Sequence, residues 1–368
     1  MRPTDKAELA EAIRDATGPL RLCGGGTRPV GRPVQGQELE TAGLRGISLY
    51  EPGALTVVAA AGTGLAELEA ALDEEGQRLP FEPMDHRVLL GTSGAPSVGG
   101  MVAANASGPR RVQAGACRDS LIGVSLVDGT GTLLRNGGRV MKNVTGYDLV
   151  KLMAGSWGTL GVLCEVAFKL LPAPEAEATL VLDGLAPHQA VTAMAAALGS
   201  PFEVSGAAHL PDQRTALRLE GFTESVRYRA GALAQRLGRW GSARLLEGEE
   251  SAALWREVRD VHAFGGRAGD VWRLSVTPSE APQLAARAGG EVLFDWGGGL
   301  VWLLLPEGTD LRMSLGPFNG HATLIRASEA TRRAIAPFHP ESAPVAALAA
   351  GLRARFDPRG ILNPGLMD

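Results

Sequence analysis

The sequence has 368 residues, 45% of them hydrophobic, which is enough for two or three globular domains. A formal net charge of −4 excludes the strongly basic surface that binding of nucleic acid or anionic lipid requires. The three cysteines are widely spaced without a CxxC motif, which excludes a disulfide framework and an iron–sulfur cluster in this chain. A charged N-terminus and the lack of an apolar run of about 20 residues predict a cytoplasmic protein. Any attachment to the inner face of the membrane is expected to be made through a complex.

The first half of the chain predicts short elements separated by glycine-rich loops. A helix capped by Thr4 is expected to open the chain, and Pro172 and Pro174 mark a domain boundary. The pattern predicts helices over 4–16, 64–75, 98–106 and 148–154, and strands over 20–22, 47–50, 55–61, 122–127 and 161–170.

The second half repeats one order of elements. Strand, helix, strand and strand occur once over 178–219 and again over 271–305, which predicts an α+β layer with helices on one face of a sheet. Further helices are expected over 225–237, 249–262 and 344–356. The final FDPRGILNPGLMD is rich in turn residues but contains apolar Ile361 and Leu362, so we expect it to be held against the rest of the protein.

The loop Gly24-Gly25-Gly26-Thr27 follows the first predicted strand. It lacks the Gly-Lys-Ser/Thr ending of a P-loop, and the prolines behind it prevent the helix that a Rossmann-type fingerprint needs. Two interpretations remain. The successive N–H groups can form an anion nest that side chains would block, or the loop is simply a tight turn.

Residues 91–108, GTSGAPSVGGMVAANASG, form a second such loop. Ser97 is a good N-cap for a helix that carries Gly99 and Gly100, although each glycine costs a helix about 1 kcal/mol relative to alanine. Either a flat ligand approaches the helix or the helix packs closely on a sheet. A third loop, Gly155 to Gly161 (GSWGTLG), leads into a strand, and three such loops are more specific than any one.

Together these segments, over about residues 18–172, resemble the FAD-binding domain of the vanillyl-alcohol-oxidase and p-cresol-methylhydroxylase type. The resemblance implies that the first loop holds the FAD pyrophosphate, that the second lies along the flavin and ribityl chain, and that the third meets the adenosine end. Asp119, in the segment Arg118-Asp119-Ser120, would lie near the flavin, and Asn363 would lie in a tail that folds back over it, although a structural turn is equally compatible with Asn363. The residues implied to bind FAD are Gly24, Gly25, Gly26, Thr27, Pro83, Ser97, Gly99, Gly100, Asn105, Gly108, Asp119, Gly161, Val162 and Asn363.

Members with covalent flavin usually attach it through a His in or near the first loop. The first loop of this sequence has Cys23 but no His, so the resemblance implies non-covalent FAD. Attachment through Cys117 is the alternative.

The phrases GRVMKNVTGYDLVKLMAGSWGTLGVL, ALWREVRD and FDPRGILNPG resemble in particular the smaller flavin-binding subunits of bacterial glycolate oxidase. This implies a role in oxidising glycolate, a 2-hydroxy acid, to glyoxylate, beside a larger flavin-binding subunit and an iron–sulfur subunit. The sequence departs from the larger subunit and from D-lactate dehydrogenases because its six histidines form no short metal-binding cluster, so no metal site is predicted.

Because no metal site is predicted, the residues that would bind and deprotonate a substrate have to be sought elsewhere in the sequence. Oxidation of a 2-hydroxy acid needs a cation for the carboxylate and a base for the hydroxyl proton. Arg259 and His262, in and after LWREVRD, are the candidates, with Arg256 and His339 as alternatives. Each could instead be an ordinary surface or core residue.

The expected fold is α+β. A two-subdomain FAD-binding domain (residues 1–172, divided near 50 and 51) precedes a small α+β cap with antiparallel sheet (173–330), and a C-terminal tail (331–368) returns to the FAD domain. Two other functions remain possible from the sequence: a self-sufficient FAD-dependent dehydrogenase or oxidase for a 2-hydroxy acid or sugar alcohol, and a structural subunit with a vestigial flavin site.

Overall fold

The computed structural model describes residues 1–138 and 147–368, so the start of the predicted 139–165 segment, residues 139–146, lies outside what it describes. The first helix, α1 (Lys6–Arg14), lies within the predicted range but has a different cap. Asp5, not Thr4, accepts the N–H groups of Ala7 and Glu8, both at 2.8 Å. Thr4 instead donates its hydroxyl to Glu8. Asp5 is the cap because its carboxylate satisfies two free helical N–H groups at once.

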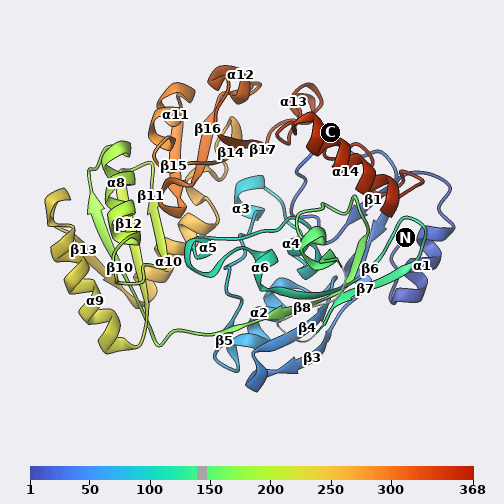
Figure 1. Ribbon diagram of the computed structural model, residues 1–368, viewed down its shortest axis with the longest axis horizontal. Coiled ribbons are helices and arrows are strands. Elements are labelled where there is room, and N and C mark those ends of the chain that lie inside the picture. The colour runs from blue at the N-terminus through green and yellow to red at the C-terminus, as the bar shows by residue number, and fades with distance from the viewer. Residues whose placement is uncertain (139–146) are drawn as a thin grey trace.

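A five-stranded antiparallel sheet, in the order β3-β4-β8-β6-β7, forms the centre of the N-terminal part (residues 1–172; Figure 1). Its strands are β3 (Ile47–Glu51), β4 (Thr56–Ala60), β6 (Leu121–Val127), β7 (Leu133–Gly137) and β8 (Val162–Lys169). Beside it, β1 (Leu20–Cys23) pairs in parallel with β2 (Gln37–Glu40), and β5 (Gln77–Arg78) pairs with β9 (Leu171–Pro172). The helices of this part are α2 (Leu65–Asp73), α3 (Arg87–Leu90), α4 (Val98–Ala103), α5 (Arg111–Ala114), α6 (Cys117–Ser120) and α7 (Leu149–Met153). Sequence analysis did not predict β2, β5, β7, β9 or the short helices α3, α5 and α6.

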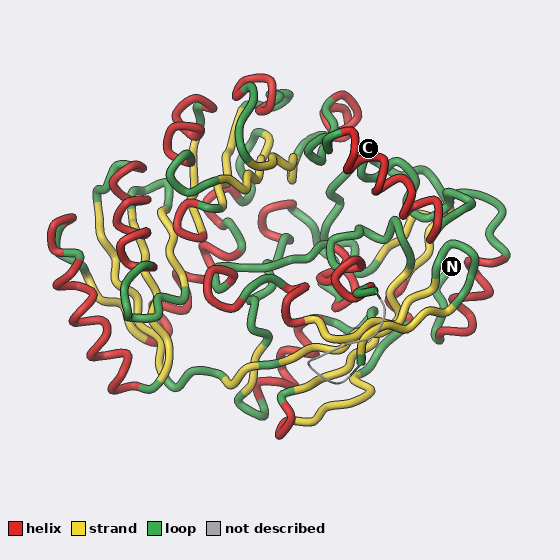
Figure 2. Tube along the Cα trace, viewed as in Figure 1, coloured by secondary structure: helices red, strands yellow, loops and turns green. Residues whose placement is uncertain are grey.

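An eight-stranded antiparallel sheet forms the second body, here called the cap (residues 176–326; Figures 1 and 2). In spatial order its strands are β13 (Arg244–Glu247), β10 (Ala176–Asp183), β12 (Arg214–Gly221), β11 (Gly206–His209), β15 (Glu291–Asp295), β16 (Leu300–Leu305), β14 (Asp270–Val276) and β17 (Gly320–Arg326). Its helices are α8 (Pro187–Leu198), α9 (Thr223–Arg236), α10 (Gly248–Arg259), α11 (Ala281–Ala288) and α12 (Leu311–Leu315).

The strand order confirms the predicted repeat. The two halves meet where β11 pairs with β15. Outward from this seam, one half runs β11-β12-β10-β13 and the other runs β15-β16-β14-β17, so equivalent strands occupy equivalent places. Each repeat is longer than predicted, because a helix and a further edge strand, β13 or β17, complete it. The antiparallel α+β architecture is thereby confirmed.

Alternation along the cap strands separates two faces of the sheet. On β16, Val301, Leu303 and Leu305 pack under helices α8, α9, α11 and α12. Leu300, Trp302 and Leu304 point the other way, into a cluster that includes Val30 and Met84 of the N-terminal part. Half of the inner face of the cap therefore covers the N-terminal part, and α10 covers the other half through Leu254, Trp255 and Val258.

A buried group of ion pairs joins the two bodies. Arg218 of β12 donates from Nη1 and Nη2 to the two carboxylate oxygens of Glu82, each at 2.8 Å, with Glu220 at 3.6 Å. Glu220 also pairs with Arg78 at 2.5 Å and with Arg110. Charged groups rarely lie this deep unless they are paired, so these contacts fix the cap against the N-terminal part.

The C-terminal tail runs through α13 (Glu329–Ala334) and α14 (Ala343–Phe356) and returns to β1 (Figure 1). Leu20 donates its N–H to the Ile361 carbonyl at 2.7 Å, and Asn363 donates its N–H to the Leu20 carbonyl at 3.0 Å. Ile361 and Leu362 pack with α1 and β1. In the described residues, no helix is long and apolar enough to cross a bilayer.

Candidate functional site

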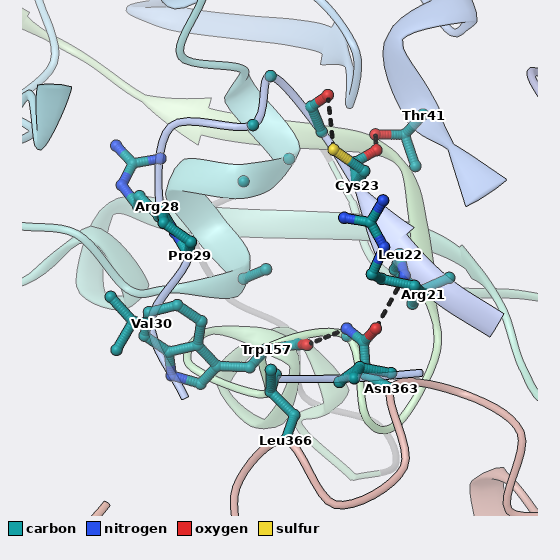
Figure 3. A pocket seen from close by; sticks show the side chains of 18 of the residues that line it. Arg21, Leu22, Cys23, Arg28, Pro29, Val30, Thr41, Trp157, Asn363 and Leu366 are labelled. Carbon is teal, nitrogen blue, oxygen red and sulfur yellow. Dashed lines mark hydrogen bonds between the residues drawn. The ribbon is translucent and has the colours of Figure 1, made fainter. Parts of the chain in front are cut away.

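A cavity of about 480 Å³ opens where β1, the loop behind it, the start of α4, residues 157–163 and the tail meet (Figure 3). It brings together segments far apart in the sequence, including most of those predicted to bind FAD. The predicted residues that line it are Gly24, Gly25, Gly26, Thr27, Ser97, Gly99, Gly100, Gly161, Val162 and Asn363.

The glycines of the first loop are needed for a reason that differs from the predicted one. A Cβ on Gly25 would overlap with the Ala95 carbonyl, and one on Gly24 would lie 2.5 Å from Ser97 Oγ. Gly26 has a φ of +70°, which disfavours other residues. The loop is thus packed back to back against the second loop, and this packing turns its other side to the cavity.

Gly99 and Gly100 of α4 face different neighbours. A Cβ on Gly99 would lie 2.7 Å from Ala61 Cβ, so this position needs glycine for close packing of helix on strand. On Gly100 it would meet Ser97 Oγ at 3.1 Å and Arg28 Nη1 at 3.6 Å, at the cavity wall. Close packing of helix on strand therefore explains Gly99, whereas approach of a ligand stays a prediction for Gly100. Ser97 is the N-cap, as predicted, and accepts the N–H of Gly100 at 3.3 Å.

The third loop reaches the cavity through Trp157, Gly158 and Gly161. Gly158 has a φ of +74°, and a Cβ there would press on Leu22 at 2.9 Å. A Cβ on Gly161 would lie 2.5 Å from Leu126 Cδ1, so packing on β6 excludes larger residues. Trp157 forms one wall beside Asn363 and Leu366 (Figure 3).

Basic side chains dominate the charge of the cavity wall. Arg28, Arg32 and Arg332 line it, and Glu329, which also lines it, pairs with Arg333. Arg332 Nε is buried without a hydrogen-bond partner among the described residues. A wall of this kind, with a glycine loop beside it, suits an anionic group such as a pyrophosphate.

Arg28 connects the cavity with the interior. Its Nε lies 3.0 Å from His86 Nδ1, and its Nη2 donates to the Met84 carbonyl at 3.1 Å. Burial lowers the pKa of Arg28 to about 10, so the guanidinium stays charged. Burial, and then the charge of Arg28, lowers the pKa of His86 to about 3. His86 is therefore a neutral hydrogen-bond acceptor that orients Arg28.

Four predicted FAD-binding residues do not line this cavity. Pro83 is buried near the loop that contacts Arg28, and Gly108 donates its N–H to the Phe81 carbonyl at 2.8 Å. Asn105 has a φ of +48° and accepts the N–H of Arg118 at 3.0 Å. Asp119 accepts the N–H of Ala116 at 2.8 Å. The contacts of the last three residues hold the turns around α4, α5 and α6.

The two predicted catalytic residues also lie away from the cavity. Arg259, at the end of α10, pairs with Asp260 through Nε and Nη2 at 2.8 and 2.7 Å. His262 is exposed, with Nε2 4.0 Å from Asp260 Oδ2. Asp260 in turn accepts the N–H of Asp85 at 2.8 Å. These contacts join α10 to the N-terminal part.

Sequence reasoning did not single out several residues of the cavity wall, above all Arg28, Trp157, Arg332 and Leu366. Two of them carried a signal, because Arg28 directly follows the first loop and Trp157 lies inside the third. Arg332 and Leu366 come from the tail, and no local pattern marked them.

Comparison with known proteins identifies the family. The chain is 37% identical over 364 residues to the glycolate oxidase subunit GlcE of Escherichia coli (strain K12), covering 98% of this chain and 95% of that protein. The chain belongs to the GlcE family. The sequence profile described as "FAD binding domain" matches residues 1–137, and the GlcD subunit of Bacillus subtilis (strain 168) is 34% identical over 127 residues, 34% of this chain and 26% of that one.

Solved structures show the same fold. p-Cresol methylhydroxylase aligns with a TM-score of 0.71 and 14% identity, over 100% of this chain and 88% of that one. An alkyldihydroxyacetonephosphate synthase aligns with a TM-score of 0.71 and 14% identity, over 99% and 76%. The predicted two-part architecture of the p-cresol-methylhydroxylase type is confirmed.

As a GlcE-family member the chain is an FAD-linked oxidoreductase subunit, and FAD is its cofactor. The basic wall and the glycine loops fit that group. Within residues 1–138 and 147–368, no group of three or more His, Cys, Asp or Glu side chains is placed to hold a metal ion.

Proposed function

We propose that this chain is the smaller flavin subunit of a glycolate oxidase and takes part in oxidising glycolate to glyoxylate. The observation that carries the proposal is the near full-length similarity to a glycolate oxidase subunit in a chain whose cavity has the features of an FAD site. FAD supplies the two-electron acceptor for oxidation of a CH–OH group.

The proposed cofactor site consists of the predicted residues that line the cavity, extended by Arg28, Trp157 and Arg332. The N–H groups of Gly24 to Thr27 would bind the pyrophosphate, with Arg28 and Arg332 supplying positive charge. Gly100 leaves room beside α4 for the flavin and ribityl chain. Gly161 and Val162 lie at the end proposed for the adenine.

The proposed binding is non-covalent. The described wall of the cavity contains no histidine, and Cys23 is its one cysteine. Burial, and then the charge of Glu38, raises the pKa of Cys23, which keeps the thiol protonated. Burial also raises the pKa of Cys117, whose side chain is fully buried in the core around α4 and β6. Neither thiol is prepared for attachment of flavin.

Arg259 and His262 stay candidates for catalysis. Arg259 would first have to leave its two hydrogen bonds to Asp260 before it could bind a substrate carboxylate. His262 is exposed and could reach a substrate only after a movement of the loop behind α10. Division of the chain at residues 172 and 330 stays a proposal as well, supported by the end of β9 at Pro172 and of β17 at Arg326.

The proposed partners are a larger flavin subunit and an iron–sulfur subunit, since the relative named GlcE is itself a subunit. Helix α14 supports an interface: none of its residues is buried, and Val345, Leu348 and Leu352 expose 47%, 70% and 40% of their surface. Their spacing of three and four residues puts them on one side of the helix. An apolar stripe of this kind suits the surface of another subunit.

The test is the visible absorption spectrum, recorded before and after anaerobic addition of glycolate, for the chain alone and for the chain co-purified with its partners. Bleaching by the chain alone would indicate a self-sufficient dehydrogenase, the second candidate from the sequence. Bleaching that needs the partners supports the proposed subunit. A colourless chain that takes up no added FAD would contradict the proposal and favour a vestigial site.

A further inference from the structure

The inner face of the cap presents an arginine toward the N-terminal part. On β14, Trp272, Leu274 and Val276 lie under the cap helices, whereas Val271 packs in the cluster shared with the N-terminal part. Side chains two residues apart on a strand point to the same face, so Arg273 shares the face of Val271. Its partners across the sheet are Trp302 on β16 and Thr323 on β17, on the same face.

A second arginine approaches the same place from the other body. Arg111, in α5 of the N-terminal part, has its guanidinium carbon 4.6 Å from the centre of the Trp296 ring. Arg273 lies 5.2 Å from the same ring centre. The ring is held in place because Trp296 Nε1 donates to the Gly108 carbonyl at 3.0 Å. Both guanidinium groups therefore contact one indole, Arg273 from the cap and Arg111 from the N-terminal part.

Neither guanidinium has a direct ion-pair partner in the part of the chain that the structure describes. Among the described residues, no carboxylate lies within 4.0 Å of either guanidinium, and neither guanidinium donates a hydrogen bond to another group. Arg218, buried on the same sheet, instead has Glu82 and Glu220 as partners. Burial, and then the nearby charge of Arg111, lowers the pKa of Arg273 to about 10.

The charge of Arg111 acts on Arg273, like charges repel one another more strongly at low dielectric, and buried charges are normally paired. A site that keeps them unpaired is prepared for an anion. Both residues are only partly buried, and His321, two residues before Thr323 on β17 and on the same face, is exposed. A small solute can therefore reach this place from solvent.

The place adjoins the proposed FAD site. Arg28 lines the cavity and contacts His86 at 3.0 Å, and the charges of both Arg28 and Arg273 lower the pKa of His86. The apolar cluster between the two bodies likewise extends from Val30 at the cavity to Trp302 and Trp296 beside Arg273. A ligand on the two arginines would sit next to the end of the cavity at Arg28.

We propose that Arg111 and Arg273 bind the carboxylate of a small organic acid within this chain, beside the Trp296 ring that both arginines contact. A planar guanidinium can bind a carboxylate through two parallel hydrogen bonds. The identity of the acid as a 2-hydroxy acid rests on the proposed function; the anion site itself does not.

The experiment uses the full chain loaded with FAD and measures binding of acetate and oxalate, which cannot be oxidised in the manner of glycolate. Quenching of tryptophan fluorescence and the flavin difference spectrum report the dissociation constant. Arg273→Gln and Arg111→Gln are each expected to weaken binding at least tenfold. Arg239→Gln is the matched control, since Arg239 lies 3.8 Å over Trp240 at a distant, exposed position, and it should leave binding unchanged.

Wild-type chain that binds no carboxylate would overturn the proposal, as would equal weakening by Arg239→Gln. Binding of phosphate as tight as that of oxalate would overturn the carboxylate assignment. If Arg273→Gln loses FAD or fails to fold, Arg273→Lys keeps the charge, loses the paired donors and should still weaken binding. If both glutamine variants weaken oxalate binding but leave glycolate oxidation by the intact complex unchanged, the anion site stands and its identification as a 2-hydroxy-acid site is overturned. Carboxylate binding by a complex that does not oxidise glycolate would contradict the proposed function and leave the anion site standing.

Discussion

Asn363 accepts the backbone N–H of Leu22 at 2.8 Å across 341 positions of sequence (Figure 3). Its Nδ2 donates to the Trp157 carbonyl at 2.9 Å. One buried side chain of the tail thus ties β1, just before the first glycine loop, to the third glycine loop. The tail is therefore part of the wall of the cavity rather than an appendage.

Replacement of Asn363 should loosen that wall. Asn363→Ala leaves the Leu22 N–H and the Trp157 carbonyl without partners, so the free energy of unfolding is expected to fall by roughly 1–3 kcal/mol. FAD should be lost more readily in the same variant. Urea unfolding and FAD retention on gel filtration measure the two effects.

Two control variants separate the causes. Asn363 has a φ of +46°, which glycine adopts without strain, so Asn363→Gly removes the hydrogen bonds without backbone strain and should still loosen the wall. Pro364→Ala, at the exposed next position, should change neither the free energy of unfolding nor FAD retention. Unchanged FAD retention in Asn363→Gly would contradict the role of the side chain.

The paired glycines of α4 predict opposite defects. Gly99→Ala introduces a methyl group 2.7 Å from Ala61 Cβ, and overpacking of this kind typically costs about 1–3 kcal/mol of stability. Gly100→Ala meets the Ser97 hydroxyl at 3.1 Å, which must shift slightly, but gains helix propensity of up to about 1 kcal/mol, so the apo chain should lose much less stability than Gly99→Ala.

The methyl group of Gly100→Ala projects at the cavity wall, so FAD affinity should fall at least tenfold in this variant. Thermal unfolding of apo chain and FAD titration measure the two properties separately. Equal loss of stability in both variants would show that Gly100, too, serves packing alone.

Arg218 is expected to be essential for joining the cap to the N-terminal part. Arg218→Met leaves Glu82 and Glu220 buried without their shared cation, which should cost roughly 3–5 kcal/mol. Arg227→Met removes an exposed arginine paired with Glu224 at 2.7 Å and is the matched control, expected to change stability little. Denaturant unfolding of both variants tests the difference, and a loss in Arg218→Met no larger than in the control would contradict it.

Asp295 predicts a pH dependence. Burial raises its pKa from 3.8 to about 7, so between those values the folded chain holds a proton that the unfolded chain has released. Stability contributed by the protonated form is complete below pH 3.8 and is lost as the pH rises through 7, by roughly 4 kcal/mol in total.

Asp295→Asn should flatten this part of the stability profile while still accepting the N–H of Trp296, which Asp295 accepts at 2.7 Å. Urea unfolding between pH 5 and 7 is the appropriate measurement, because Glu220 acts at lower pH. Burial by itself would raise the pKa of Glu220, but the positive charges of Arg218, Arg110 and Arg78 outweigh it and lower that pKa to about 2. An identical profile for wild type and Asp295→Asn would refute the assignment.

Local patterns predicted most of the elements. Periodicity predicted the duplicated order of the cap, including the helix that is α8, because amphipathic spacing is a property of neighbouring residues. It did not identify β2 or β17, whose pairing depends on strands distant in sequence.

The sequence by itself determined the family, the three glycine loops and the kind of cofactor, since each depends on residue types at short fixed spacings. Tertiary structure decided why the glycines are needed: Gly25 meets Ala95 and Gly99 meets Ala61. It also paired Arg259 with its neighbour Asp260 and, within residues 1–138 and 147–368, left Arg273 and Arg111 without an ion-pair partner beside Trp296. Whether a charged side chain is neutralised depends on what folding brings within a few ångströms of it, and no local pattern in the chain carries that information.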